Sequence, residues 1–141
     1  MSKLIIALRI SLGIIFFWYG MLKFFPELSP AEQLATDTIN WIFSGMIPAT
    51  ISMKLLASWE VIVGLGLIFG IFTRFVLSLF LLHMCLTFLP LVAFPQLSFT
   101  QAPYAFTIIG QYIVKNIVFI LVGIMIFKYE SEKLEVNKSR A

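Results

Sequence analysis

The chain has 141 residues, of which 60% are hydrophobic and 12% are charged. So few charges could not cover so much apolar surface in water, so the composition excludes a soluble domain and indicates a membrane protein. Low Pro and Gly contents and a lone cysteine, Cys85, also exclude disorder, collagen-like repeats and a disulfide scaffold.

The first of four apolar stretches covers residues 4–25, which is long enough to cross ~30 Å of hydrocarbon with about 20 residues. Arg9 interrupts it and no small-residue cleavage site follows, so we interpret it as a span and not as a signal peptide. Arg9 is close enough to the end of the span to extend its side chain to the membrane surface. The cluster Phe16-Phe17-Trp18-Tyr19 is typical of an interfacial aromatic belt.

A connection of some length follows, and Ser29-Pro30-Ala31-Glu32 within it has the pattern of a capping box with proline at the first helical position. We therefore predict a short amphipathic helix over residues 30–45. It is either a plain connection along the membrane surface or a lid over an intramembrane site.

The remaining spans are predicted over residues 52–72, 75–94 and 105–127, which gives an all-α, four-helix transmembrane bundle in a single domain. The segment 66–70 has a Gly-x-x-x-Gly spacing, which we interpret as packing inside the bundle. The third connection, residues 95–103, is uncharged and bounded by prolines, and predicts a simple loop. The tail, residues 128–141, is expected to be a solvated helix end.

Basic residues gather on one side of the four spans. They are Lys3, Arg9, Arg74, Lys128, Lys133, Lys138 and Arg140. The other side receives Lys23, Lys54, Glu27, Glu32 and Asp37. Because cytoplasmic segments are enriched in Lys and Arg, both termini are predicted cytoplasmic and the helix over 30–45 extracytoplasmic. Insertion and anionic lipid then explain the net charge of +3, so we expect membrane lipid and no nucleic acid as a partner.

Polar side chains inside the spans need an explanation, because an ionisable group in hydrocarbon costs roughly 2.5–3.5 kcal/mol on insertion scales. Glu60 in the second span lies about 12 Å from the outer end at 1.5 Å per residue. Helical spacing places further polar groups at similar depth in the outer half of the bilayer. The predicted ligand-binding set is Trp18, Tyr19, Lys23, Glu60, His83, Gln111, Lys115 and Asn116.

Glu60 and Lys115 form the natural ion pair of this set, and they are the candidate catalytic residues. Such a pair either fixes the register of the helices or forms a site that binds or protonates a ligand. Ala57 and Gly64 share the stripe of Glu60, so we expect a neighbouring helix to approach it closely. No second His or Cys has ligand spacing to His83, so no metal site is expected.

In these polar parts of the spans, the sequence resembles the DoxX/DoxD-like family of small four-helix membrane proteins. The matching pieces are Leu8-Arg9 with Gly13, Trp18-Tyr19-Gly20-Met21-Leu22-Lys23, Glu60-Val61-Ile62-Val63-Gly64-Leu65, Gly70-Ile71-Phe72-Thr73-Arg74 and Gly110-Gln111-Tyr112-Ile113-Val114-Lys115-Asn116. The resemblance implies a multi-pass protein of the bacterial inner membrane or of an archaeal plasma membrane. Some members are the membrane subunit of a thiosulfate:quinone oxidoreductase and others are linked to oxidative-stress complexes. It also implies a polar core of Glu60, Lys115 and Lys23.

The sequence departs from a self-sufficient redox protein, because it has no redox cysteine pair, haem-ligand pair or soluble catalytic domain. Redox chemistry would need a bound quinone or a soluble or membrane redox partner. No covalent cofactor is expected. Whether the chain is itself an enzyme, and whether it forms a homo-oligomer, stays open.

Three functions are therefore compared. The first is a quinone-interacting membrane subunit of an oxidoreductase system. The second is a non-catalytic scaffold or binding subunit with a structural Glu–Lys pair. Small-molecule or proton transport is the third and is disfavoured, because four spans leave little room for alternating access and neither the second nor the third span is expected to be broken.

Overall fold

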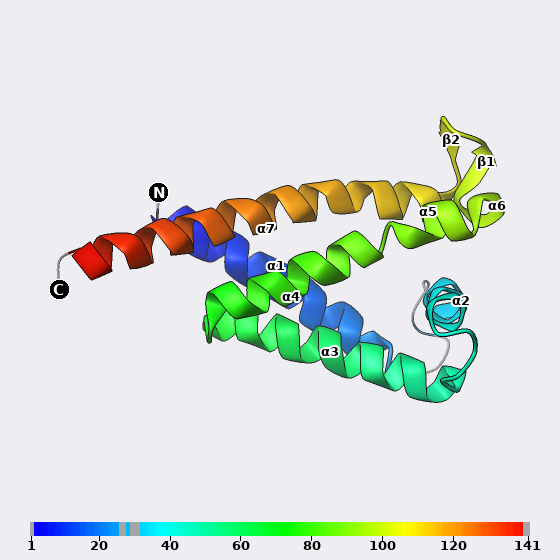
Figure 1. Ribbon diagram of the computed structural model, residues 1–141, viewed down its shortest axis with the longest axis horizontal. Coiled ribbons are helices and arrows are strands. Elements are labelled where there is room, and N and C mark those ends of the chain that lie inside the picture. The colour runs from blue at the N-terminus through cyan, green and yellow to red at the C-terminus, as the bar shows by residue number, and fades with distance from the viewer. Residues whose placement is uncertain (1, 26–27, 29–31, 140–141) are drawn as a thin grey trace.

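The computed structural model describes residues 2–25, 28 and 32–139 of the chain, and four of its segments are long and apolar enough to cross a membrane. They are α1 (Ser2–Leu22), α3 (Ala49–Phe69), the third span from Thr73 to Ala93, and α7 (Ile108–Ser139). The spans alternate in direction, so both termini lie at the same end as the turn between α3 and α4 (Figure 1). We call this the terminal end and the opposite one the loop end. The predicted all-α architecture of four spans is confirmed, and the cytoplasmic location of the termini stays a prediction.

The third span is not a continuous helix. It consists of α4 (Thr73–Leu86) and α5 (Leu89–Ala93), separated at Thr87 and Phe88. Pro90 lacks the N–H that a continuous helix would need at this point, which accounts for the interruption. Thr87 and Phe88 keep right-handed helical backbone angles, and Thr73–Ala93 is long and apolar enough to form one span of 21 residues. The interruption does not divide the third span into a pair of half-helices.

The helix bounds otherwise follow the predictions closely. The second span begins and ends three residues earlier than expected, and α7 begins later than residue 105. Beyond the predicted span, α7 continues through the mixed charges of the tail as far as Ser139.

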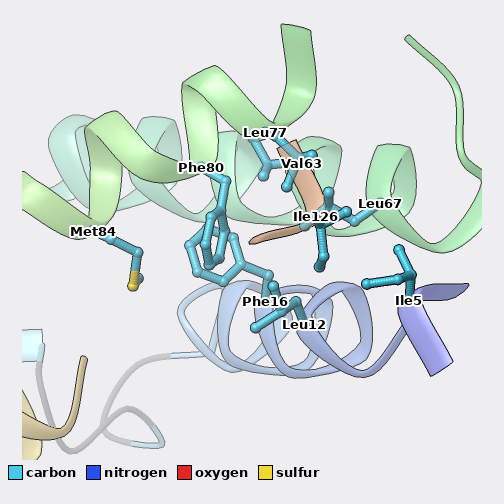
Figure 2. Packing of buried hydrophobic residues seen from close by; sticks show 9 residues of the cluster. All are labelled: Ile5, Leu12, Phe16, Val63, Leu67, Leu77, Phe80, Met84 and Ile126. Atoms are coloured by element: carbon cyan, nitrogen blue, oxygen red, sulfur yellow. The ribbon is translucent and has the colours of Figure 1, made fainter. Parts of the chain in front are cut away.

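The hydrophobic core lies where the four spans meet between the terminal end and the middle of the bundle. Figure 2 shows its side chains converging from all four spans. They are Ile5, Leu12 and Phe16 from α1, Val63 and Leu67 from α3, Leu77, Phe80 and Met84 from α4, and Ile126 from α7. The rings of Phe16 and Phe80 pack with their centroids 4.8 Å apart.

Glycines allow α1 and α3 to cross in close contact. A Cβ atom at Gly64 would lie 2.5 Å from the backbone nitrogen of Phe17, and one at Gly13 would lie 2.8 Å from the carbonyl oxygen of Gly64. Farther along, a Cβ atom at Gly20 would lie 2.8 Å from the Cβ atom of Glu60. The predicted close approach of a helix to the Gly64 stripe is thus confirmed, and the approaching helix is α1.

The Gly-x-x-x-Gly segment also packs inside the bundle, as predicted. Gly66 faces Val76 of α4, and Gly70 faces the Arg9 guanidinium of α1. Gly70 ends α3 with a φ of 70°, a left-handed conformation that suits glycine.

The loop end carries more regular structure than predicted. Helix α2 (Glu32–Ile42) packs on α3 and α5 and buries Leu34 and Thr38. It is shorter than the predicted helix, and residues 29–31 of the capping box lie outside the described residues.

The third connection is not a simple loop, because it contains α6 (Pro95–Ser98) and an antiparallel hairpin of β1 (Phe99–Gln101) and β2 (Ala105–Phe106). The rings of Phe99 and Phe106 pair across the hairpin at 4.9 Å. Strands this short leave no alternating pattern that a sequence could reveal.

Candidate intramembrane site

A buried cluster of ionisable side chains joins three of the spans. The Lys23 ammonium donates a hydrogen bond of 2.6 Å to Oε2 of Glu60. His83 Nε2 lies 3.3 Å from the other carboxylate oxygen, Oε1. The side chains of Lys23, Glu60 and His83 are only 8%, 7% and 13% exposed. We call these three residues the Glu60 cluster.

The end of α1 explains how Lys23 reaches Glu60. Lys23 directly follows the last residue of α1, and its N–H bonds to the carbonyl oxygen of Gly20 at 3.2 Å. Because helical side chains tilt toward the helix N-terminus, a residue at this end is directed back into the bundle. The missing side chain of Gly20 then lets the α1 backbone lie against Glu60. The contact depends on a glycine and on where the helix ends.

His83 reaches the cluster from α4, beside an aromatic ring of α1. The Phe16 and His83 rings meet edge to face with centroids 5.1 Å apart. Glu60 lies about 16 Å along α3 from Ala49, and His83 about 15 Å along α4 from Thr73, at 1.5 Å per residue. Glu60 and His83 therefore lie near the middle of their spans, and Lys23 reaches them from the loop end of α1. The location of the cluster in the outer half of the bilayer stays a prediction.

The predicted pairing of Glu60 with Lys115 is wrong. Lys115 is exposed, and its ammonium lies 5.3 Å from the ring centroid of Tyr112 on its own helix. Gln111 is exposed as well. Lys115 does not contact Glu60 because α7 packs mainly on α4, whereas Glu60 of α3 faces α1 and His83.

The other predicted ligand-binding residues lie outside the cluster. Asn116 of α7 donates a 2.9 Å hydrogen bond to the hydroxyl of Thr87, which itself donates to the Met84 carbonyl oxygen at 2.6 Å. Asn116 therefore connects α7 to the interruption of the third span. Trp18 and Tyr19 are 63% and 52% exposed. For Trp18 this agrees with a residue of the aromatic belt.

Sequence reasoning missed the Lys23–Glu60 contact although a signal for it was present. Gly13, Gly20 and Lys23 share one stripe of α1, and Glu60 and Gly64 share one stripe of α3. Two glycine-bearing stripes pack most closely when they face one another, and that arrangement brings Lys23 to Glu60. The Phe16 ring beside His83 had no such signal.

One further polar atom near the cluster is unusual. The indole N–H of Trp59, the residue before Glu60, is buried and has no hydrogen-bond partner among the described residues. Metal ligands do not gather here, since no group of three or more His, Cys, Asp or Glu side chains suited to an ion occurs in the described part of the chain.

The Glu60 cluster has the chemistry of a donor and proton-exchange site. Lys23 and His83 offer N–H donors, and the carboxylate oxygens of Glu60 accept hydrogen bonds. The net charge of the cluster is zero with neutral His83 and +1 with protonated His83. Such a group can hydrogen-bond a carbonyl oxygen and exchange a proton with it.

Comparison with known sequences assigns the family. The sequence model of the DoxX family matches residues 4–94. The chain belongs to the DoxX family. In this DoxX protein the matched range contains the first three spans and all three residues of the Glu60 cluster. It ends before α7, so the resemblance seen at residues 110–116 stays a prediction. No curated protein and no solved structure gives a significant match to the chain.

Proposed function

We propose that this DoxX protein is a membrane subunit of an oxidoreductase system, located in a bacterial inner membrane, and that it binds a quinone at the Glu60 cluster. The observation that carries the proposal is the meeting of three ionisable side chains from three spans in the middle of the bundle. A pair that only fixes helix register needs two such groups. The third makes the cluster more elaborate than packing requires.

The donors of the cluster suit the two carbonyl oxygens of a quinone ring. Glu60 uses one of the three N–H groups of the Lys23 ammonium. His83 is the most exposed residue of the cluster and the one that a ligand would contact first. The Phe16 ring beside it offers an apolar, flat surface.

A bound quinone would supply two-electron, two-proton redox chemistry. The chain would supply hydrogen-bond donors and a route for protons through His83 and Glu60. A soluble or membrane redox partner would supply the electrons.

A non-catalytic scaffold is the second candidate, and one observation favours it. Both carboxylate oxygens of Glu60 already have a basic partner, and all three side chains are largely buried. In this case the cluster holds α1, α3 and α4 together and has no ligand of its own.

Thermal unfolding of the purified protein with a short-chain quinone or quinol analogue separates the two candidates. Quinone binding predicts a melting temperature that rises with analogue concentration. His83→Leu should remove the rise while the protein stays folded. Lys54→Met, which removes an exposed lysine elsewhere on α3, should keep it. No rise in the wild-type protein, or an equal rise in the folded His83 variant, would reject the quinone site and favour the scaffold.

A further inference from the structure

The sides of α1 and α7 that face each other near the terminal end become exposed toward the loop end. The two helices contact one another near the terminal end, where Ile5 and Ile126 share the core, and they diverge toward the loop end in Figure 1. Exposure follows this divergence. Ile126 is 0% exposed, whereas Lys115, on the same stripe of α7 with Phe119 and Val122 between them, is exposed.

The same change occurs along α1. Leu12 and Phe16 are buried, whereas Tyr19, the next residue of that stripe, is 52% exposed. Tyr112 of α7, one turn from Lys115, is 64% exposed. Side chains that continue core-facing stripes are thus left without a covering helix on both sides of the divergence.

An uncompensated cation lies on this uncovered surface. Among the described residues Lys115 has no ion-pair partner, and its ammonium lies against the Tyr112 ring, one turn nearer the loop end. Its Cα atom is about 10 Å along α7 from Ile108 at 1.5 Å per residue. The flexible stem therefore extends toward the membrane surface, as is usual for lysines inside spans.

From these observations we infer that an anionic phospholipid binds the exposed sides of α1 and α7 at the loop end, with its phosphodiester on Lys115 and its acyl chain toward the core. Gln111 and Tyr112 are exposed beside Lys115 and offer hydrogen bonds to the headgroup. Ile15 and Val122, which are partly buried and lie nearer the crossing of the helices, provide apolar walls for the chain.

Charge favours a lipid over a second copy of the protein. Lys115 needs an anion, and Glu60, which is buried inside the bundle, is already held by Lys23 and His83. Two copies that met at this surface would bring one Lys115 toward another. A phospholipid places its negative charge near the membrane surface and its apolar chains below, in the same order as the polar and apolar residues of α7.

The test compares the thermal stability of the detergent-solubilised protein during titration with phosphatidylglycerol and with neutral phosphatidylcholine. We expect saturable stabilisation by phosphatidylglycerol alone. Lys115→Met should weaken the apparent affinity about fivefold, the effect of one lysine near an anionic headgroup. Lys115→Arg should restore most of the affinity. Lys54→Met, an exposed lysine of α3 at the same end, is the matched control and should keep it.

Three results would overturn the inference. Equal losses in Lys115→Met and Lys54→Met would mean general attraction to surface charge. Equal stabilisation by the neutral lipid would mean that the charge of Lys115 is not used. A change of oligomeric state in Lys115→Met, measured by light scattering, would assign this surface to a protein partner. The quinone titration uses a neutral ligand and depends on His83, so either proposal can fail alone.

Discussion

Lys23 stabilises the bundle mainly because it removes the penalty of an unpaired carboxylate in the membrane. The 2.6 Å contact lies between side chains that are less than a tenth exposed, so water screens it little. A buried ion pair contributes modestly in comparison with an apolar pair, but removal of one partner costs about 3–5 kcal/mol. His83, at 3.3 Å, shares the same carboxylate.

Lys23→Met is therefore expected to lower the free energy of unfolding by about 3–5 kcal/mol, because Glu60 remains buried with one basic neighbour. Adding Glu60→Gln should recover most of this loss, since the amide no longer needs a countercharge. Denaturant titration of the two single variants and the double variant measures the coupling. Lys54→Met, which removes an exposed lysine, should change stability little. Additive effects in the double variant would contradict the pairing.

At Asn116 the structure predicts a small, local effect. Asn116→Leu removes the 2.9 Å bond to Thr87, and interhelical hydrogen bonds in membranes average about 0.6 kcal/mol. Thr87→Val should have a similar effect, and the double variant should lose no more than either single one. The same unfolding titration measures all three, with Thr100→Val on the exposed hairpin as control. Full additivity would show that the bond contributes nothing.

Among the elements, the spans were predictable and their neighbours were not. Hydropathy and length locate an apolar helix within a few residues, because the membrane itself imposes them. Spacing along Gln111 and Lys115 places both on one side of a helix, but it does not say which helix that side meets. That depends on the packing of α7 on α4 and on α1 ending beside Glu60. The site was therefore predicted in its members Glu60, Lys23 and His83, and incorrectly in its central pair.

The close crossing of α1 and α3 predicts the sign of a glycine substitution. In an isolated helix Gly→Ala is stabilising by up to about 1 kcal/mol. Gly64→Ala should instead destabilise the protein by about 1–3 kcal/mol, because the new methyl group would meet the backbone of Phe17. Thermal unfolding compares it with Ala7→Leu, which adds volume on an exposed part of α1. A stabilised Gly64 variant would show that the helices do not cross this closely.

Across the whole molecule, some charged residues are paired inside the bundle, whereas others lie at its terminal end. Lys23, counted at first as a basic residue of the outer side, is neutralised by Glu60. Arg9 lies against Gly70 and Arg74 lies 5.5 Å from the Phe127 ring centroid, both at the terminal end. Without Lys23, fewer basic residues remain at the loop end, and the cytoplasmic location of the termini stays a prediction.

This asymmetry predicts which end a membrane-impermeant maleimide can label in intact cells. Cys85 is first replaced by Ser, so that each test protein carries one cysteine. Thr100→Cys, on the exposed hairpin of the loop end, should react from outside. Ser139→Cys, at the exposed terminal end of α7, should react only after the membrane is permeabilised. This pattern is expected because basic residues are retained on the cytoplasmic side during insertion. The reverse pattern would mean that the excess of Lys and Arg does not orient this bundle.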